Sequence, residues 1–173
     1  MPSTYTLISS NVLSSSAASV TFSAIPSTYT DLVVRMSVRT DYASTEDELA
    51  IILNSVTTGT LYSNTNLYGT GAGAGSDRTD GNRFEYRLRI DANNNTSNTF
   101  SSVEFYVPSY TASQNKQVSI DLAHEQNGST AYRTAVAGLF RSTSAISNIE
   151  FRSDNAANFV SGSSFYLYGV KKS

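Results

Sequence analysis

The stretch LVVRMSVR at residues 32–39 has an apolar side chain at every second position. The regular apolar set is Leu32, Val34, Met36 and Val38. Because side chains along a β-strand point alternately to opposite faces, this spacing places the set on one face. The stretch therefore indicates a strand with one buried and one hydrated face, which is typical of antiparallel sheets.

The same alternation recurs along most of the chain. Further strands are predicted at 4–13, 19–25, 83–90, 103–107, 118–122, 132–140, 149–151 and 165–168, and the continuous apolar run at 49–53 has strand length. Only Ser44 to Glu48 offers a possible helix start, with a capping residue before acids. Pro26 and Pro108 follow predicted strands, where a missing N–H does little harm.

This pattern predicts an all-β protein whose residues 1–173 form a single domain. The strand number and length favour an antiparallel β-sandwich, a jelly roll of about 8–10 strands. An immunoglobulin-like sandwich is the second choice, because it needs fewer strands and a shorter chain.

The composition narrows the possible functions. Ser, Thr and Asn make up 62 of 173 residues, charged residues only 15 %, and the net charge is -2. A nucleic-acid binder would carry a basic stripe, so no nucleic-acid partner is expected. The absence of cysteine excludes thiolate metal sites and disulfides, and one histidine cannot form an all-histidine metal site. These properties argue against most enzymes.

Targeting and membrane signals are not expected. Residues 1–5 have no basic region, no apolar signal region follows them, and the longest apolar runs are far short of the ~20 residues that span a bilayer. The sequence predicts a soluble protein made in a cytoplasm, with no membrane partner.

Gly69 to Gly75, with the sequence GTGAGAG, has the appearance of a phosphate-binding loop. A Walker loop needs a Lys and a Ser or Thr after its last glycine and then a helix, and neither follows here. We interpret residues 67–82 as a flexible loop that becomes ordered against a neighbour, and we expect no cofactor.

Three sets of polar residues are candidates for a chemical site. Asp77, Asp80 and Asn82 could supply oxygen ligands to Ca²⁺, but their spacing is not that of an EF-hand, and a polar turn is the simpler interpretation. His124 lies near a strand end, where a solvent-facing or hydrogen-bonded role is ordinary. Asp121 and Glu125 would lie about 13 Å apart on one strand, too far for a glycosidase pair. We expect no catalytic residue and no metal ligand.

The eleven tyrosines are the most distinctive aromatic feature. Phe165 and Leu167 already give their strand a core face, so Tyr166 and Tyr168 would form a second apolar face, covered by another sheet or a neighbouring subunit. Tyrosines anchor protein interfaces and stack on sugars. The candidate interface residues are Tyr62, Tyr68, Tyr166 and Tyr168, with Gly71, Gly73 and Gly75 of the glycine-rich segment.

Several stretches resemble the small virion proteins of tailed marine and cyanobacterial phages. They are TYTLISSNVL at 4–13, ASVTFSAIP at 18–26, TFSSVEFYVP at 99–108 and NFVSGSSFYLYGVK at 158–171. The resemblance covers both ends and the middle of the chain, whereas residues 41–82 look variable. Its motifs are strand signatures, so they identify a fold lineage better than a role.

The resemblance implies a non-enzymatic jelly-roll subunit of a phage particle. Such a protein would be a capsid decoration (cement) protein, commonly trimeric, which stabilises the capsid by bridging major capsid subunits. It would be made in the host cytoplasm and reside on the virion. The alternative that it implies is a tail or fibre component, which would recognise host-surface carbohydrate through loop tyrosines such as Tyr62 and Tyr68.

Overall fold

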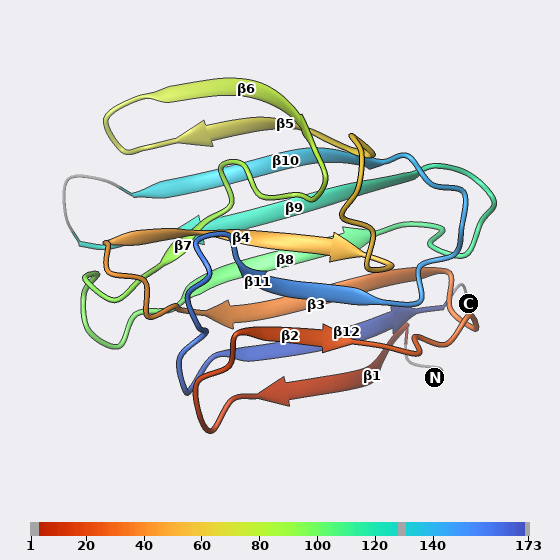
Figure 1. The fold of residues 1–173 in the computed structure, drawn as a ribbon, viewed down its shortest axis with the longest axis horizontal. Helices are drawn as coiled ribbons and strands as arrows, with labels where there is room; N and C mark the ends of the chain where they lie inside the picture. The colour runs from red at the N-terminus through yellow and green to blue at the C-terminus, as the bar shows by residue number, and fades with distance from the viewer. Residues whose placement is uncertain (1–3, 128–130, 172–173) are drawn as a thin grey trace.

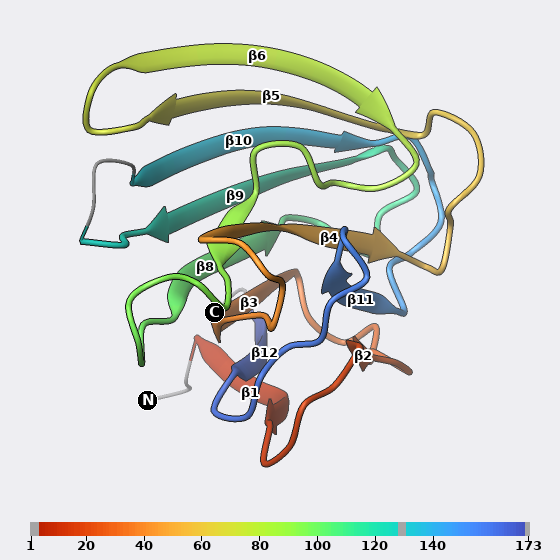
Figure 2. The same cartoon turned by 60° about the vertical axis from the view of Figure 1, so that its left-hand side comes forward.

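A computed structural model describes residues 4–127 and 131–171, which fold into two antiparallel sheets stacked face to face (Figures 1 and 2). Within these ranges there is no helix, and so none that could cross a membrane. The strands are β1 (Tyr5–Val12), β2 (Ser19–Phe22), β3 (Asp31–Val38), β4 (Glu46–Leu53), β5 (Tyr62–Gly69), β6 (Ala74–Gly81), β7 (Arg89–Asp91), β8 (Ser101–Val107), β9 (Lys116–His124), β10 (Tyr132–Phe140), β11 (Ile149–Ser153) and β12 (Ser164–Val170).

The predicted β-sandwich is confirmed, and its strand order is that of an enlarged jelly roll. A jelly roll has eight strands, B to I, in sheets ordered B-I-D-G and C-H-E-F. The small sheet, β2-β11-β4-β7, follows the first order. The large sheet, β1-β12-β3-β8-β9-β10-β5-β6, follows the second order, with three strands, β8 to β10, in place of H. β1 and β12 extend the large sheet beyond strand C.

The core lies between the sheets and forms one cluster of buried side chains. Its centre is aromatic: the Phe105 ring lies 6.4 Å from that of Phe151, which lies 5.8 Å from that of Phe165. The strand at 32–39 follows the predicted alternation on its core face, where Leu32 and Val34 are fully buried. On the other face Arg35 is exposed, but Val33 and Arg39 are buried, so the prediction of a hydrated face holds only in part.

The prediction of a flexible loop at residues 67–82 is wrong. Most of this segment belongs to the hairpin of β5 and β6, whose eight cross-strand pairs run from Tyr62 opposite Gly81 to Gly69 opposite Ala74. β5 also pairs along its whole length with β10, and this pairing holds β5 extended so that β6 can pair with its other side. The glycine-rich segment at 69–75 therefore forms the turn between the two strands and the strand ends beside it.

Two further local predictions are corrected. Residues 83–90 are not a continuous strand: Arg87 adopts a left-handed backbone (φ 66°), which interrupts the extended chain, so β7 begins only at Arg89. Residues 44–48 do not start a helix. Glu46 and Glu48 begin β4 instead, where both form ion pairs with Arg89 of the neighbouring strand.

Candidate interaction surface

The outer face of the large sheet carries a row of apolar side chains at the end formed by β1, β12, β3 and β8. Leu7 on β1 lies opposite Tyr168 on β12, Tyr168 opposite Val33 on β3, and Val33 opposite Tyr106 on β8. Directly opposed residues share a face of a sheet, so this row crosses four strands. We call the surface around it the tyrosine face. It consists of Tyr5, Leu7, Val12, Tyr106, Tyr166 and Tyr168.

The alternation in β12 places two of these tyrosines. Phe165 and Leu167 point into the core and are almost fully buried, so Tyr166 and Tyr168 point the other way and remain partly exposed. This arrangement is the two-faced strand that the sequence indicates. Within the described residues no second sheet covers these tyrosines, so their outer sides face solvent.

On β8 the tyrosine face is held by a hydrogen bond, whereas on β1 its side chains are exposed to solvent. Tyr106 donates a hydrogen bond to Asp31 Oδ2 (3.0 Å), and burial followed by this bond raises the pKa of Tyr106. At the other end, the ring of Tyr5 packs edge-on against that of Tyr168, at 6.5 Å. The β1 side chains are open: Leu7 is 51 % and Val12 58 % exposed. Apolar side chains gathered in this way mark an interaction surface.

Charges beside the tyrosine face are paired with each other. Arg35 Nε lies 3.0 Å from Glu104 Oε2, across neighbouring strands, and both side chains are exposed. Asp31 accepts hydrogen bonds from Tyr106 and from the backbone N–H of Ser109. The surface is therefore suited to an apolar or neutral polar partner rather than to a strongly charged one.

Tyr62 and Tyr68 do not belong to this surface, and their assignment to a contact loop is wrong. Tyr62 is fully buried; its hydroxyl accepts the N–H of Leu53 (2.9 Å) and donates to the carbonyl of Val56 (3.0 Å) or Leu53 (3.1 Å). Burial raises its pKa to about 12. Tyr68 faces the inner side of β5 under the guanidinium of Arg87, 4.5 Å from its ring centre.

The three glycine candidates lie at or beside the turn of the β5–β6 hairpin. Gly71 needs its lack of a side chain because its φ is +79°. Gly75 lies under Tyr68, and a Cβ there would be 2.7 Å from the Tyr68 hydroxyl. Gly71 and Gly73 have open space around them. Because a strand rather than a helix follows, the segment has no phosphate-binding geometry.

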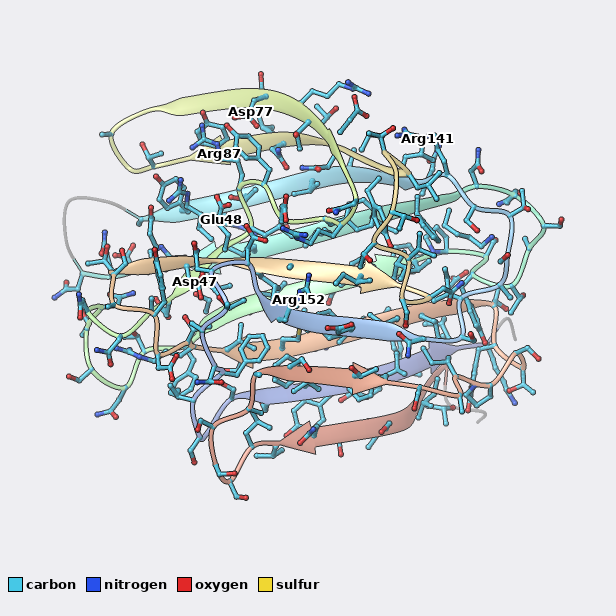
Figure 3. The ribbon with its side chains drawn as sticks, in the orientation of Figure 1. Asp47, Glu48, Asp77, Arg87, Arg141 and Arg152 are labelled. Carbon is cyan, nitrogen blue, oxygen red and sulfur yellow. The ribbon has the colours of Figure 1, made fainter. Side chains whose placement is uncertain are left out.

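The acidic candidates are engaged in internal pairs. Asp77 Oδ2 lies 3.0 Å from Arg87 Nε, and Figure 3 shows the two residues side by side. Asp80 pairs with Arg78 at 2.8 Å, and Asp121 pairs with Arg133. In residues 4–127 and 131–171 no three His, Asp or Glu side chains are grouped as a metal site would require.

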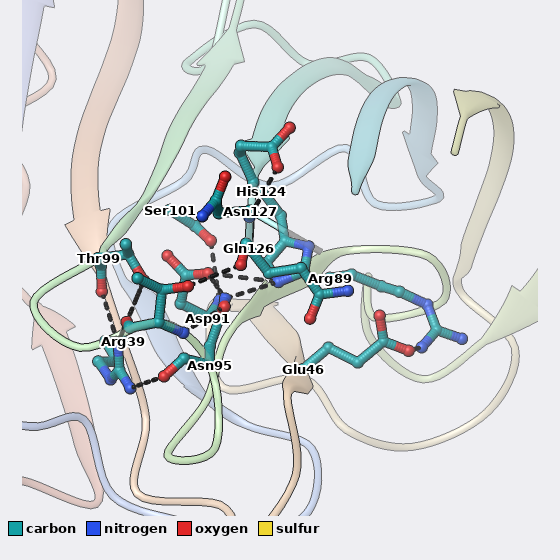
Figure 4. Close-up of polar contacts among 12 residues, drawn as sticks. Arg39, Glu46, Arg89, Asp91, Asn95, Thr99, Ser101, His124, Gln126 and Asn127 are labelled. Carbon is teal, nitrogen blue, oxygen red and sulfur yellow. Dashed lines mark hydrogen bonds and ion pairs between the residues drawn. The ribbon is translucent and has the colours of Figure 1, made fainter. Parts of the chain in front are cut away.

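His124 belongs to a buried polar cluster, shown in Figure 4. Its Nε2 lies 3.3 Å from Asp91 Oδ1 and 3.2 Å from Asn95 Nδ2. Burial lowers the pKa of His124, although Asp91 beside it acts in the opposite direction. Of the two roles expected for this histidine at a strand end, solvent-facing or hydrogen-bonded, the structure shows the second. Both His124 and Asp91 are almost inaccessible to solvent.

Arg39, which the sequence did not single out, holds the loop that closes this cluster. Its guanidinium donates hydrogen bonds of 2.7–3.1 Å to the carbonyls of Asn93, Asn95, Thr96 and Thr99. One buried side chain thus satisfies four backbone acceptors of residues 92–100. The role of the cluster is to fix this loop.

The outer face of the small sheet is charged, in contrast to the tyrosine face. Arg83 forms ion pairs with Glu85 and with Asp154, the latter at 2.5 Å. Burial, followed by the nearby Asp154 carboxylate, raises the pKa of Glu85 to about 7. Figure 3 shows Glu48 and Arg152 on the same side of the molecule. Sequence alternation alone could not bring these residues together, because they come from separate segments.

Comparisons with known proteins identify no family. No protein-family model matches the chain, and no curated protein matches it. Among solved structures, the chain is similar to the alginate lyase vAL-1 from Chlorella virus, with a TM-score of 0.30 and 6 % identity, covering 92 % of this chain and 83 % of that chain. A likeness this low says nothing about the activity of the present protein.

Proposed function

We propose that this protein is a non-enzymatic structural protein of a tailed-phage virion that binds the capsid as a decoration protein. Its partner would be the major capsid protein, and its place the capsid surface. The observation that carries the proposal is the tyrosine face, a partly exposed apolar surface on a rigid sheet. The resemblance of the strand sequences to phage virion proteins supports the same role.

The proposed mechanism is burial of the tyrosine face across neighbouring capsid subunits. Specific protein interfaces bury on the order of 1,600 Å² in total and are anchored by tyrosines and other large side chains. Tyrosine suits this use because its large ring loses little conformational entropy on binding. A decoration protein held in this way links subunits that the internal pressure of packaged DNA would otherwise separate.

The low charge of the chain supports a contact that resists changes in salt. Charged residues are 15 % of the sequence, and Arg35 and Glu104 beside the tyrosine face neutralise each other. Contacts between exposed charges are screened by salt, whereas apolar burial is not. We therefore expect capsid binding to change little when the salt concentration is raised about tenfold.

Binding to capsids that lack the protein tests the proposal directly. The wild type should saturate the capsids in proportion to their major subunits. Tyr168→Ser, in the centre of the tyrosine face, should raise the dissociation constant at least about tenfold. Leu67→Ser is the matched control, because Leu67 is 64 % exposed on β5, away from β1. Absence of binding, or equal loss in both variants, would contradict the proposal.

Quantitative mass spectrometry of virions separates the capsid role from a tail role. A decoration protein should be present in proportion to the major capsid protein, whereas a tail or fibre component should be far rarer. The carbohydrate alternative loses support because Tyr62 is fully buried, and the partly exposed Tyr68 is covered by the guanidinium of Arg87. A glycan array would restore it if the purified protein bound a sugar.

A further inference from the structure

β1 is an edge strand with an open side. It pairs with β12 on one side, and no strand of the described residues pairs with its other side. All of its residues except Ile8 are exposed, and Ile8 turns toward the core where the β1–β12 register shifts between Leu7 and Ser9. An edge of this kind presents backbone donors and acceptors to any strand that approaches it.

This edge lacks the devices that usually prevent strand pairing. Proteins protect exposed edges with lysine, proline, short strands or inward-pointing charges. β1 is eight residues long and contains neither charged residues nor proline. Its single register shift is the one protective feature. By contrast, the edge strand β6 at the other end of the same sheet carries Asp77, Arg78 and Asp80.

The neutral edge extends over both sheets. Residues 1–30 contain no Asp, Glu, Lys, Arg or His. They include β1 and also β2, the edge strand of the small sheet, and Figure 1 shows both strands at the same side of the sandwich. One whole side of the molecule is therefore bounded by uncharged strands.

We propose that β1 pairs antiparallel with β1 of a second copy of this chain. Antiparallel pairing of two identical strands creates a twofold axis, so each charge on the edge would enter the interface twice, once from each copy. Like charges placed opposite each other destabilise a sheet, and a fully neutral strand avoids this repulsion. Electrostatic complementarity therefore favours an identical neutral strand over a charged partner segment.

The exposed apolar side chains indicate a register for this pairing. Leu7 and Val12 both lie on the outer face and are 51 % and 58 % exposed. A register with Leu7 opposite Val12 of the second copy joins these side chains, and the twofold axis repeats the contact. In this arrangement the two eight-stranded sheets become continuous, and so do their tyrosine faces.

The pairing gives dimers rather than the trimer that the resemblance implies. A threefold assembly needs two different patches that meet head to tail, whereas β1 offers one self-complementary edge. The inference does not depend on the capsid role, because it concerns the free protein. In the proposed dimer the two tyrosine faces join into one surface twice as large as that of a single copy.

Mass measurement of the purified protein, by light scattering or sedimentation equilibrium, tests the inference. The wild type should be a dimer, and Leu7→Lys should raise the dimer dissociation constant at least about tenfold by placing two lysines in the interface. Leu67→Lys adds the same charge on β5, away from β1, and should leave the dimer intact. Far-UV circular dichroism should show that both variants are folded.

Cross-linking tests the register, because the chain contains no cysteine of its own. In a double variant, Leu7→Cys with Val12→Cys, the paired Cα atoms of the two copies would lie about 4.5–5.5 Å apart, within disulfide range. Oxidised glutathione should then give covalent dimers, while Leu67→Cys should not. A monomeric or trimeric wild type, or cross-linking no greater than in the control, would overturn the inference. A monomer that still binds capsids would leave the proposed function standing.

Discussion

Removing one buried hydroxyl should measurably destabilise this protein, and Tyr62→Phe is the substitution that does so. The hydroxyl lies between Leu53 and Val56 and accepts the Leu53 N–H at 2.9 Å. Without it, that N–H and a carbonyl lose a partner in a fully buried place. An unsatisfied buried group costs about 1–3 kcal/mol, so we expect the free energy of unfolding to fall by about that amount.

Urea denaturation followed by fluorescence or circular dichroism measures the effect. The midpoint should fall while the m-value stays constant, because the surface exposed on unfolding is unchanged. In a chain of this size, each kcal/mol lowers the Tm by about 2–4 °C.

Tyr168→Phe is the matched control, because Tyr168 lies on the outer face of the sheet and should change stability by less than about 0.5 kcal/mol. Equal stability of Tyr62→Phe and wild type would refute the stabilising role assigned to the hydrogen bonds of the Tyr62 hydroxyl.

Three further perturbations test other parts of the structure. Gly138→Ala would place a Cβ 2.5 Å from Val118 Cγ2 and should cost about 1–3 kcal/mol in urea denaturation, whereas Gly81→Ala meets nothing closer than 3.6 Å and should be tolerated. Arg39→Lys cannot satisfy four carbonyls, so amide hydrogen exchange in residues 92–100 should accelerate; unchanged exchange would contradict its role. Because the pKa of Glu85 is raised from its ordinary 4.5 to about 7, the folded state binds more protons, and stability should fall between about pH 4.5 and pH 7. Glu85→Gln should remove that part of the slope, and identical pH profiles of variant and wild type would exclude the shift.

Hydrophobic alternation is sufficient to predict a strand wherever the core face of that strand is apolar. β3 and β12 follow it, and so the sandwich and the outward Tyr166 and Tyr168 could be predicted. The hairpin of β5 and β6 could not, because Asn64 and Asn66 occupy buried positions on the inner face of β5. Their side chains are hydrogen-bonded, Asn64 to Asn66 at 2.8 Å and Asn66 to Asp77 at 3.0 Å, so polar residues are tolerated where the pattern requires apolar ones.

The tyrosine face illustrates a second reason for incomplete prediction. Tyr166 and Tyr168 lie two residues apart on one face of β12, but Leu7 and Tyr106 join them only through the pairing of β1, β12, β3 and β8. Strand order in a sandwich depends on contacts between distant segments, and the alternation within each strand does not reveal which strands become neighbours. The residues of the surface could be suspected individually, but their grouping required the structure.

The strand order also constrains how the chain is synthesised and folded. Among the described strands, β1 pairs only with β12 and β2 only with β11, so the first two strands have partners that come last in the strand order. During translation β1 and β2 are made before the other described strands, and they lack these partners until residues 149–170 have left the ribosome. Neutral, unpaired strands are prone to associate with other chains in that interval. Chaperones therefore have their greatest opportunity to act before residues 149–170 appear.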